Sequence, residues 1–324
     1  MTRRDAFAWT VMALTPLFFS SNLVFGRWTV PEVAPATLAF VRWGLVALAL
    51  APFSVGALRR TSPLLGTSPP LGTSPPWGLV TVLGALGMGV CGAVVYLALA
   101  WTSATNAVLI YTTSPVFILL IERLRGVPLA PRKLVGCLVA LAGVATIVFR
   151  GEPARLLGLD FNTGDALILA CAIAWAGYSI LFRDERVSGF GAAALFGLVA
   201  GAGALLLLPF AAAEWWAGAP MPTTPRAWTG IAGIVVFSSL IAFGGYQFGL
   251  RRFGAAVTGV FMYLLPIYGV LLAVLFLGER VEPFHGAGVV LILSGVVVAT
   301  WVRQPASSSS TSPAKETSPS VQSN

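Results

Sequence analysis

Charged residues are scarce in this sequence. Asp, Glu, Lys and Arg together make up 10% of its 324 residues, whereas 57% are apolar. A soluble domain carries roughly 25% charged residues, so this chain has too little polar surface to cover a water-facing globule. The scarcity of charge excludes an ordinary soluble protein and favours one that is embedded in lipid.

Residues that carry catalytic and metal chemistry are also few. The chain has one histidine, His285, and three cysteines, Cys91, Cys137 and Cys171, which fall in apolar stretches without metal-ligand spacing. We therefore expect no metal, no disulfide framework and no catalytic cluster. The chain has no G-x-x-x-x-G-K-[ST] loop, which argues against ATP-driven transport, and we expect no cofactor. No Asp or Glu lies deep in an apolar stretch, so no buried proton relay is evident.

The apolar residues lie in long runs. A run of about 18 residues or more can cross the ~30 Å hydrocarbon core of a bilayer as a helix. Cutting the sequence at charges and at Pro and Gly gives ten runs: residues 6–26, 35–55, 77–99, 104–121, 134–149, 164–182, 190–210, 228–250, 255–277 and 284–302. Strands of alternating polarity, which a β-barrel requires, are not seen, and a signal peptide would explain only the first run. The predicted fold class is all-α: a polytopic membrane protein with ten transmembrane helices.

The net charge of +8 comes mostly from basic residues in the short segments between these runs. With the N-terminus inside, 14 of the 20 Lys and Arg lie on the cytoplasmic side, 5 lie outside and Arg42 lies within a run. Cytoplasmic loops of membrane proteins carry an excess of Lys and Arg. We therefore predict that both termini are cytoplasmic, which agrees with ten crossings, and we expect no nucleic-acid partner.

The two halves of the sequence resemble each other. A shift of 151 residues places Trp77 on Trp228, Ala104 on Ala255 and Pro115 on Pro266; with small gaps, Gly136 and Gly143 fall on Gly288 and Gly295, Arg27 on Arg183, and Pro52 on Pro209. Each half, residues 1–150 and 151–303, contains five runs. Because five is odd, the second half must enter the membrane from the opposite side. We predict two inverted five-helix repeats, an architecture that recurs in transporters; a static bundle built by duplication is the alternative.

Two segments are rich in Ser, Thr and Pro. Residues 56–76 include most of a hexad written three times from Thr61 to Gly78, and residues 304–324 form a tail. Both have too few apolar residues to offset the entropy of ordering, which predicts disordered cytoplasmic segments. Recognition by a polyproline-binding partner is the alternative.

Short motifs in the runs are similar to those of a known family. Phe19-Ser20-Ser21-Asn22, Phe40-Val-Arg42, and Pro266 with Glu279-Arg280 resemble the drug/metabolite transporter superfamily in its ten-helix EamA branch. The first half departs from the last motif, because Pro128 stands where Glu is expected and Glu122-Arg123 comes earlier. Aromatic residues in the inner halves of the runs are similar to those of amino-acid exporters of the YddG type. The resemblance implies export of amino acids across a bacterial inner membrane.

Polar and aromatic residues inside the runs are the candidates for a substrate site. Arg42 is expected to face a wet interior, where it binds a substrate carboxylate, clamps backbone carbonyls or reaches toward the outer face. Trp175 and Tyr178 share a helix face, as a cavity wall or as lipid-facing filler. Pro115 and Pro266 interrupt corresponding helices, as hinges at the site or as packing kinks. The other candidates for the substrate pathway are Asn22, Tyr96, Trp101, Asn106, Tyr111, Tyr246, Gln247, Tyr263 and Tyr268.

Together these features predict a secondary carrier and not an enzyme. It is expected to move small metabolites outward by alternating access, amino acids first, aromatic and large neutral ones among them. The alternatives are export of drugs or other metabolites, a channel, and a membrane enzyme acting on lipid-linked substrates. The expected partners are a small-molecule substrate and the lipid bilayer, and the expected assembly is a monomer. Transport is expected to be facilitated, or coupled through rim groups such as Glu279 or His285.

Overall fold

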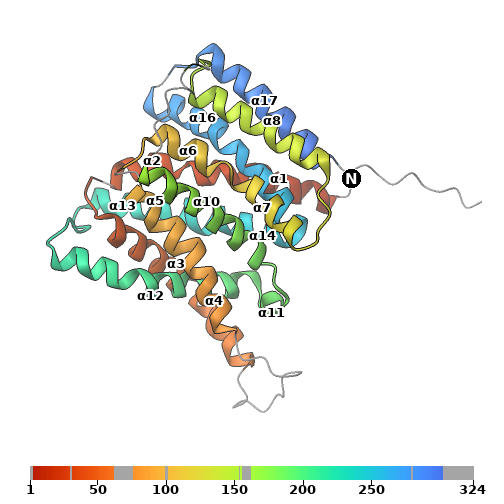
Figure 1. Cartoon of the computed structure of the whole chain (residues 1–324). Coiled ribbons are helices and arrows are strands. Elements are labelled where there is room, and N and C mark those ends of the chain that lie inside the picture. Colours follow the sequence, from red (N-terminus) through yellow and green to blue (C-terminus); the bar gives the residue numbers. More distant parts are fainter. Residues whose placement is uncertain are drawn as a thin grey trace, which may run out of the picture.

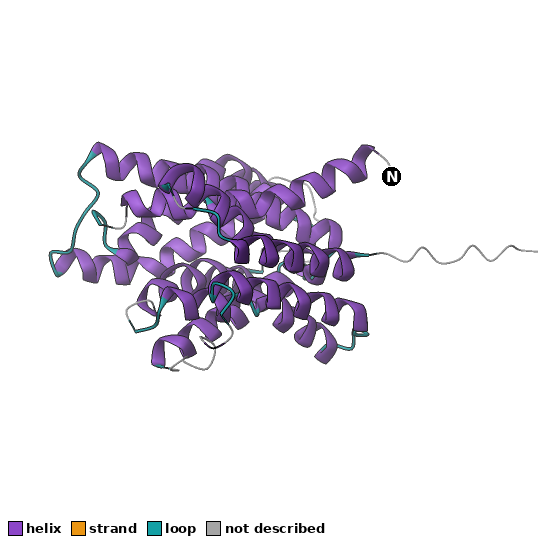
Figure 2. Ribbon diagram, turned by 90° about the horizontal axis from the view of Figure 1, so that it is seen from above, coloured by secondary structure: helices purple, strands orange, loops and turns teal. Residues whose placement is uncertain are grey.

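A computed structural model of the chain describes residues 3–29, 31–61, 76–98, 101–152, 154, 162–278 and 280–301. All regular structure in these residues is helical (Figures 1 and 2). The described residues contain ten segments long and apolar enough to cross a membrane: Asp5–Gly26, Pro35–Arg59, Trp77–Val94, Asn106–Leu124, Pro131–Val148, Thr163–Leu181, Ala192–Trp216, Pro225–Phe253, Ala255–Phe276 and Pro283–Thr300. The ten predicted spans are thus confirmed.

Two predicted boundaries differ from the structure by more than three residues. The seventh helix, expected to end at residue 210, passes through Pro209 and ends at Trp216. Proline is tolerated within a membrane helix because neighbouring groups can satisfy the backbone carbonyl that it leaves without a hydrogen bond. The loop expected from residue 56 begins later, since the second helix continues to Thr61 through Ala57 and Leu58, both good helix formers. Most of that loop and the tail 304–324 lie outside the described residues.

The first five spans are built from nine helical elements. They are α1 (Arg3–Ser20) and α2 (Asn22–Thr29); α3 (Pro35–Thr61); α4 (Trp77–Gly84), η2 (Ala85–Val94) and α5 (Val95–Ala98); α6 (Ala104–Tyr111) and α7 (Ser114–Leu124); and α8 (Pro131–Val148). The last five spans are α10 (Thr163–Leu181); α12 (Ala192–Trp216); α13 (Pro225–Gly233), η3 (Ile234–Ile241) and α14 (Ala242–Phe253); α15 (Ala255–Phe261), η4 (Met262–Leu264) and α16 (Leu265–Leu277); and α17 (Pro283–Thr300). A short helix, α11 (Glu185–Ser188), connects α10 to α12.

The fifth and tenth spans, α8 and α17, run antiparallel in close contact. Figure 1 shows them side by side along one edge of the bundle. A Cβ atom added at Gly136 would lie 2.6 Å from the carbonyl oxygen of Gly295, and one added at Gly143 would lie 2.7 Å from that of Gly288. Glycine is needed on both helices because only hydrogen in place of Cβ allows the backbones this close. These are the glycines that the internal repeat aligns.

The second and seventh spans, α3 and α12, also pair antiparallel. Ser54 Oγ, near the end of α3, donates to the carbonyl oxygen of Ala194 near the start of α12 (3.1 Å). At the other end, the Glu214 carboxylate accepts from the backbone N–H groups of Ala36 (2.9 Å) and Thr37 (2.7 Å). Glu214 therefore supplies acceptors for the otherwise unsatisfied first turn of α3.

The pairing of corresponding spans in opposite directions confirms the inverted repeat. The other contacts also occur in pairs in which each helix is replaced by its counterpart in the other half. The first span, α1, packs on η3 and α14 of the eighth, and the sixth span, α10, packs on η2 of the third. Likewise α1 packs on α16 of the ninth span, and α10 on α7 of the fourth. The molecule is therefore two interlocked copies of one five-helix unit.

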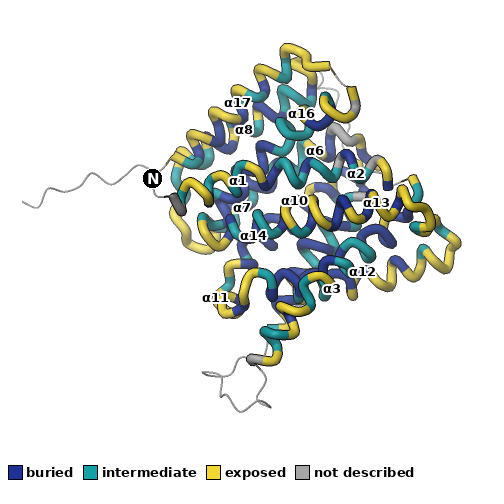
Figure 3. Tube along the Cα trace, turned by 180° about the vertical axis from the view of Figure 1, so that it is seen from behind, coloured by how far each residue is buried: buried dark blue, intermediate teal, exposed yellow. Residues whose placement is uncertain are grey.

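Apolar side chains cover the outside of the bundle. Leu205, Leu275 and Phe276 are each at least 65% exposed, and Figure 3 shows exposed positions along the outward faces of the helices, with buried ones toward the centre. Such a surface suits lipid, because hydrocarbon solvates these side chains without cost.

Candidate substrate cavity

Three of the spans are interrupted near the middle of the bundle. The first is broken at Ser21, between α1 and α2; the fourth at Thr112 and Thr113, between α6 and α7; and the ninth at the single 3-10 turn η4. Pro115 is the second residue of α7 and Pro266 the second of α16. Proline has no N–H to donate to the preceding turn, so each lies where the chain cannot continue a regular α-helix.

Two further spans carry wide turns at matching positions. The third span winds as a π-helix over η2 and the eighth over η3. π-Helical turns are rare and often occur at functional sites. The breaks and the wide turns are tied together: Ser20 Oγ donates to the Leu265 carbonyl oxygen (3.0 Å), and Ser21 Oγ bonds to Ser238 Oγ of η3 (3.0 Å).

These irregular segments surround a cavity of about 570 Å³. Its wall is mostly apolar and aromatic, with a few hydroxyl groups. The residues that line it are Phe19, Ser20, Asn22, Arg42, Trp43, Gly87, Cys91, Gly92, Val95, Ala107, Val108, Tyr111, Thr112, Ser114, Pro115, Ile168, Trp175, Ser238, Phe243, Met262, Tyr263, Leu265, Pro266 and Gly269. Its size and lining are typical of a small-molecule site.

Arg42 of α3 is the only charged residue among those lining residues. Its Nε donates to Ser239 Oγ (2.6 Å) and one Nη donates to the Ser238 carbonyl oxygen (3.1 Å). The guanidinium carbon lies 4.6 Å from the centre of the Trp43 ring. Arg42 thus clamps a backbone carbonyl of the wide turn η3 and also lines the cavity, and its binding of a substrate carboxylate stays a prediction.

Trp175 of α10 lies at the centre of an aromatic cluster. Its ring is 5.5 Å from that of Tyr178, 4.8 Å from that of Tyr246 and 5.6 Å from that of Phe243. Trp175 is 5% exposed and Tyr178 is fully buried, so neither faces lipid. The cluster gives the cavity a flat aromatic wall on which an apolar side chain can stack.

A hydrogen-bonded layer closes the cavity beyond Trp175. Gln247 Nε2 donates to the Tyr178 hydroxyl (2.8 Å), and the Ser179 and Tyr246 hydroxyls bond to each other (2.7 Å). All four side chains are at most 1% exposed. This closing layer, Tyr178, Ser179, Tyr246 and Gln247, joins α10 to α14 on the side of Arg183 and Arg251, which the sequence predicts to be cytoplasmic.

The predicted site residues divide into two groups. Those that line the cavity are Asn22, Arg42, Tyr111, Pro115, Trp175, Tyr263 and Pro266. Those that do not are Tyr178, Tyr246 and Gln247, which form the closing layer, and Trp101, Asn106 and Tyr268. The side chain of Tyr96 lies outside the described residues.

Trp101, Asn106 and Tyr268 have other surroundings. Trp101 is 57% exposed in the turn between α5 and α6. Asn106 Nδ2 donates to Asp165 Oδ2 (3.3 Å), part of a buried cluster at the start of α10. The Tyr268 hydroxyl donates to the Ala13 carbonyl oxygen (2.9 Å).

Several cavity residues were not predicted. Trp43 and Phe243 form much of its aromatic wall, and Ser238 and Gly92 lie in the wide turns. Of these four residues, Trp43 could have been predicted from the sequence, since it follows Arg42 directly. Serine and glycine in a span have many other uses and do not indicate a cavity. Cys91, expected only to pack, also lines the cavity, and its thiol donates to the Cys171 carbonyl oxygen (3.4 Å).

Of the rim groups considered for coupling, His285 does not line the cavity. The His285 ring accepts the Glu282 backbone N–H at Nδ1 (2.9 Å), a capping interaction at the start of α17. Glu279 lies outside the described residues. Among the described residues, no three His, Cys, Asp or Glu side chains are placed to hold a metal ion.

Comparison with known proteins shows the family. The sequence profile of the EamA-like transporter family matches residues 7–149 and again residues 162–301, one match for each repeat. A solved crystal structure with 24% sequence identity superimposes with a TM-score of 0.67, covering 91% of this chain and 96% of the other, so the fold is a known one.

Named relatives are transporters of several organisms. An uncharacterized transporter of Archaeoglobus fulgidus is 28% identical over 90% of this chain and 96% of its own length. A probable terminal-alkyne amino-acid exporter of Streptantibioticus cattleyicolor is 26% identical over 68% of this chain and 72% of its own. The uncharacterized inner membrane transporter YedA of Escherichia coli is 27% identical over 60% of this chain and 61% of its own. The prediction of a transporter rather than an enzyme is confirmed, and the chain belongs to the EamA-like transporter family.

Proposed function

We propose that this transporter exports amino acids with large neutral or aromatic side chains across a bacterial inner membrane by alternating access. The observation that carries the proposal is the position of Arg42, the one charged side chain among the described residues that line a mostly apolar and aromatic cavity. A guanidinium pairs well with a carboxylate, and the ring of Trp175 offers a surface for an apolar side chain. A cavity of about 570 Å³ has room for an amino acid of the size of phenylalanine.

The inverted repeat supports alternating access. Two copies of one unit in opposite orientations can exchange conformations, which turns a cavity open to one face into a cavity open to the other. The broken helices at Pro115 and Pro266 supply places where the halves can bend. The amino-acid exporter of S. cattleyicolor supports the substrate class by similarity alone. The basic residues on the predicted cytoplasmic side support an orientation with both termini inside.

A second candidate is the export of other apolar metabolites or drugs. The wall of the cavity favours it, because Phe19, Trp43, Trp175 and Phe243 would also stack on aromatic molecules that lack a carboxylate. The two candidates differ in their dependence on Arg42, which only a carboxylate needs.

Counterflow in proteoliposomes tests the proposal. Liposomes preloaded with unlabelled phenylalanine or leucine should accumulate the labelled compound, which a simple pore would not do. Arg42→Ala and Trp175→Ala should each reduce the initial rate at least tenfold, since each removes a direct substrate contact. Arg226→Ala and Trp216→Ala, at exposed positions, are matched controls. Unchanged counterflow in both cavity variants would overturn the site, and Arg42-independent transport would favour the second candidate.

Cys91 offers a direct report on occupancy. It lines the cavity, whereas Cys137 and Cys171 are fully buried. In a protein with Cys137→Ser and Cys171→Ser, a small thiol reagent should react with Cys91, and a transported amino acid should slow that reaction. If the transported amino acid does not change the rate at which Cys91 is labelled, the result would argue against binding of that amino acid in this cavity.

Movement down a concentration gradient is the proposed energetics. The described residues that line the cavity include no Asp, Glu or His that could carry a coupling proton. Uptake driven by a pH gradient, and abolished when Glu279 and His285 are replaced together, would replace this proposal with a proton-coupled one.

A further inference from the structure

The inverted repeat gives residues of the cavity counterparts in the other half. A shift of 156 residues relates the first span to the sixth and places Phe19 on Trp175. The shift of 151 residues relates the third span to the eighth and places Gly87 on Ser238. All four of these residues line the cavity. The two shifts therefore relate positions that are equivalent in the structure as well as in the sequence.

Some contacts between these spans are made in both halves. The ring of Trp9, in the first span, lies 4.5 Å from that of Phe253 at the end of the eighth. The two shifts place Trp9 on Asp165 and Phe253 on Thr102, and the Thr102 hydroxyl donates to the Asp165 carboxylate. The chemistry differs, but equivalent positions touch in both halves. A contact that both halves make is one that an exchange of their conformations leaves in place.

The closing layer, in contrast, is made in one half only. Its bond between Tyr178 of the sixth span and Gln247 of the eighth corresponds to a pairing of Asn22, in the first span, with Tyr96, in the third. That pairing would also join an amide to a phenol, with the two groups exchanged between the helices. The Asn22 Oδ1 atom is buried and accepts no hydrogen bond from the described residues, and the side chain of Tyr96 lies outside them. A buried acceptor without a donor is unfavourable and calls for an explanation.

The cavity occupies the place where the first half would have its own closing layer. The shift of 151 residues places Val95 on Tyr246. Asn22 and Val95 line the cavity, whereas their counterparts Tyr178 and Tyr246 do not. The cavity therefore extends between the first and third spans, toward the predicted outer face, through the positions that are filled between the sixth and eighth.

We propose that Asn22 and Tyr96 form a second gate, which closes the outer end of the cavity when the closing layer opens. In that conformation the Tyr96 hydroxyl donates to Asn22 Oδ1. The inference rests on the alternating access of the proposed function and names residues that carry it out. An amide–phenol bond that is lost at one end is replaced by an equivalent bond at the other, which keeps the two conformations close in energy.

Thiol labelling at position 250 tests the second gate. Leu250 is fully buried, one turn beyond Gln247 on α14. A cysteine introduced there, in a protein without the three native cysteines, reacts with a maleimide when the closing layer opens. Tyr96→Phe removes a hydrogen bond that only this open conformation makes. Labelling in detergent without substrate should therefore slow by about two- to tenfold.

A double variant tests whether the two gates oppose each other. Tyr178→Phe weakens the closing layer and should accelerate labelling at position 250. Because the two gates lie at different ends of the cavity, their effects should add, and the protein with both Tyr96→Phe and Tyr178→Phe should label within about twofold of the wild type. Labelling of the double variant as fast as that of Tyr178→Phe alone would overturn the second gate.

Asn22→Ala is an independent variant of the same gate. It removes the acceptor and should slow labelling as Tyr96→Phe does. Adding Tyr96→Phe to it should have no further effect, because the bond between the two is already lost. Tyr268→Phe, which removes a phenolic hydroxyl bonded to the Ala13 carbonyl oxygen, is the matched control and should leave the rate unaltered. Effects of Asn22→Ala and Tyr96→Phe that simply add, or no effect of either, would overturn the second gate.

Labelling and transport separate this inference from the proposed function. Labelling in detergent needs no substrate, so it reports on the gates whatever the cargo is. Counterflow of phenylalanine by a protein whose labelling Tyr96→Phe does not slow would overturn the second gate and leave the proposed function standing. Absence of counterflow with phenylalanine and leucine alike would overturn the proposed function, and slower labelling in Tyr96→Phe would still support the gate.

Discussion

The amide of Gln247 donates a hydrogen bond of 2.8 Å to the hydroxyl of Tyr178, and this bond joins α14 to α10 directly beyond the cavity. Both side chains are at most 1% exposed. With the Ser179–Tyr246 bond beside it, it closes one end of the cavity with groups that satisfy each other. A path through that end requires α10 and α14 to separate and both bonds to break.

Tyr178→Phe should therefore make opening of this end easier. The change leaves the Gln247 amide without its acceptor in a dry layer, at a cost of about 1–3 kcal/mol to the closed state alone. The measurement is maleimide labelling of a cysteine introduced at Leu250, a buried position one turn further along α14, in a background without the three native cysteines. Labelling should be several-fold faster than with Tyr178 present.

Tyr268→Phe is the control for this experiment. It also removes a phenolic hydroxyl, but one that is only partly buried and that bonds to the Ala13 carbonyl oxygen and not to the closing layer. Equal labelling of all three proteins would show that the Tyr178–Gln247 bond does not hold the cavity closed.

Gly288→Ala should destabilise the pairing of α8 with α17. The new Cβ atom would lie 2.8 Å from the Gly143 carbonyl oxygen, a backbone atom that can move only with its helix. Overpacking of this kind costs about 1–3 kcal/mol. Gly286→Ala, two residues away on α17 with no neighbour within 4 Å of the new atom, should be neutral or stabilising by up to about 1 kcal/mol. Thermal unfolding in detergent compares the two, and equal midpoints would argue against close contact at this seam.

Glu214→Ala should destabilise the protein by about 0.5–2 kcal/mol, the range observed when a helix loses its cap. The carboxylate accepts from Ala36 N, Thr37 N and Thr37 Oγ1, so the variant leaves these donors at the start of α3 without their acceptor. Glu214→Gln retains one carbonyl acceptor and should lose less. The exposed Glu185, replaced by Gln, is the control in the same unfolding measurement. A variant as stable as the wild type would show that water replaces the cap.

The sequence was sufficient for the spans and for the inverted repeat. Length and hydropathy decide whether a segment can cross a bilayer, and both can be read from the order of residues. The seven-residue spacing of Gly136 and Gly143, repeated at Gly288 and Gly295, also marked a helix contact. The sequence does not show which helix packs against each glycine-bearing face, because the contact of α8 with α17 depends on how both halves pack.

The cavity was predicted in part for a similar reason. Arg42 and Trp175 stood out because a charge or a large polar aromatic residue inside a span is costly unless it faces the interior. Interior position alone does not separate a cavity wall from a sealed layer, which is why Tyr178 and Gln247 were expected in the pathway. The wide turns η2 and η3 come from extra residues within a helical turn and have no distinct composition, so Ser238 and Gly92 gave no signal.

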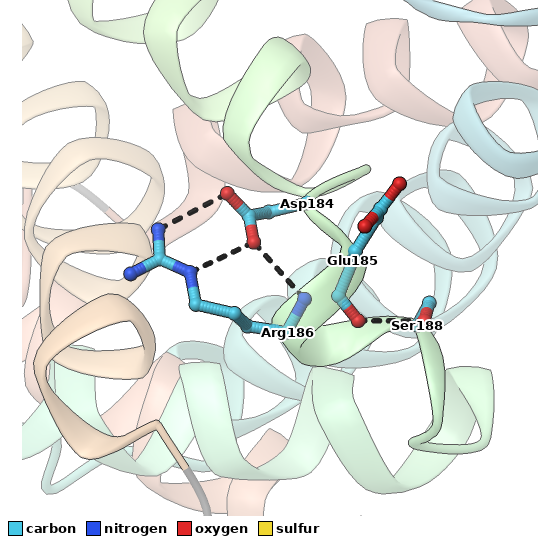
Figure 4. Close-up of polar contacts among 4 residues, drawn as sticks. All are labelled: Asp184, Glu185, Arg186 and Ser188. Atoms are coloured by element: carbon cyan, nitrogen blue, oxygen red, sulfur yellow. Dashed lines mark hydrogen bonds and ion pairs between the residues drawn. The ribbon is translucent and has the colours of Figure 1, made fainter.

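The connection between α10 and α12, within the second repeat, provides a prediction on pH. At α11, Asp184 accepts hydrogen bonds from the backbone N–H of Arg186 and from its side-chain Nε and Nη, at 2.9–3.0 Å (Figure 4). The bonds from the guanidinium, and then that from the backbone, lower the pKa of Asp184 from 3.8 to about 2. A carboxyl group whose pKa is lowered in the folded state stabilises that state above its unfolded pKa and ceases to do so as pH falls through the folded value.

Asp184→Asn should therefore lower the stability of the folded protein above pH 4, and near pH 2 the variant should be as stable as the wild type. The effect should be small, because Arg186 is exposed and water screens the pair. The measurement is the difference in thermal midpoint between the two proteins from pH 7 to pH 2, with Arg186→Gln alongside. Arg186→Gln also removes the ion pair, so its difference in thermal midpoint from the wild type should likewise shrink as the pH falls. A difference that stays constant down to pH 2 would show that Asp184 acts through the backbone bond that caps α11, which asparagine can partly replace, and not through its charge.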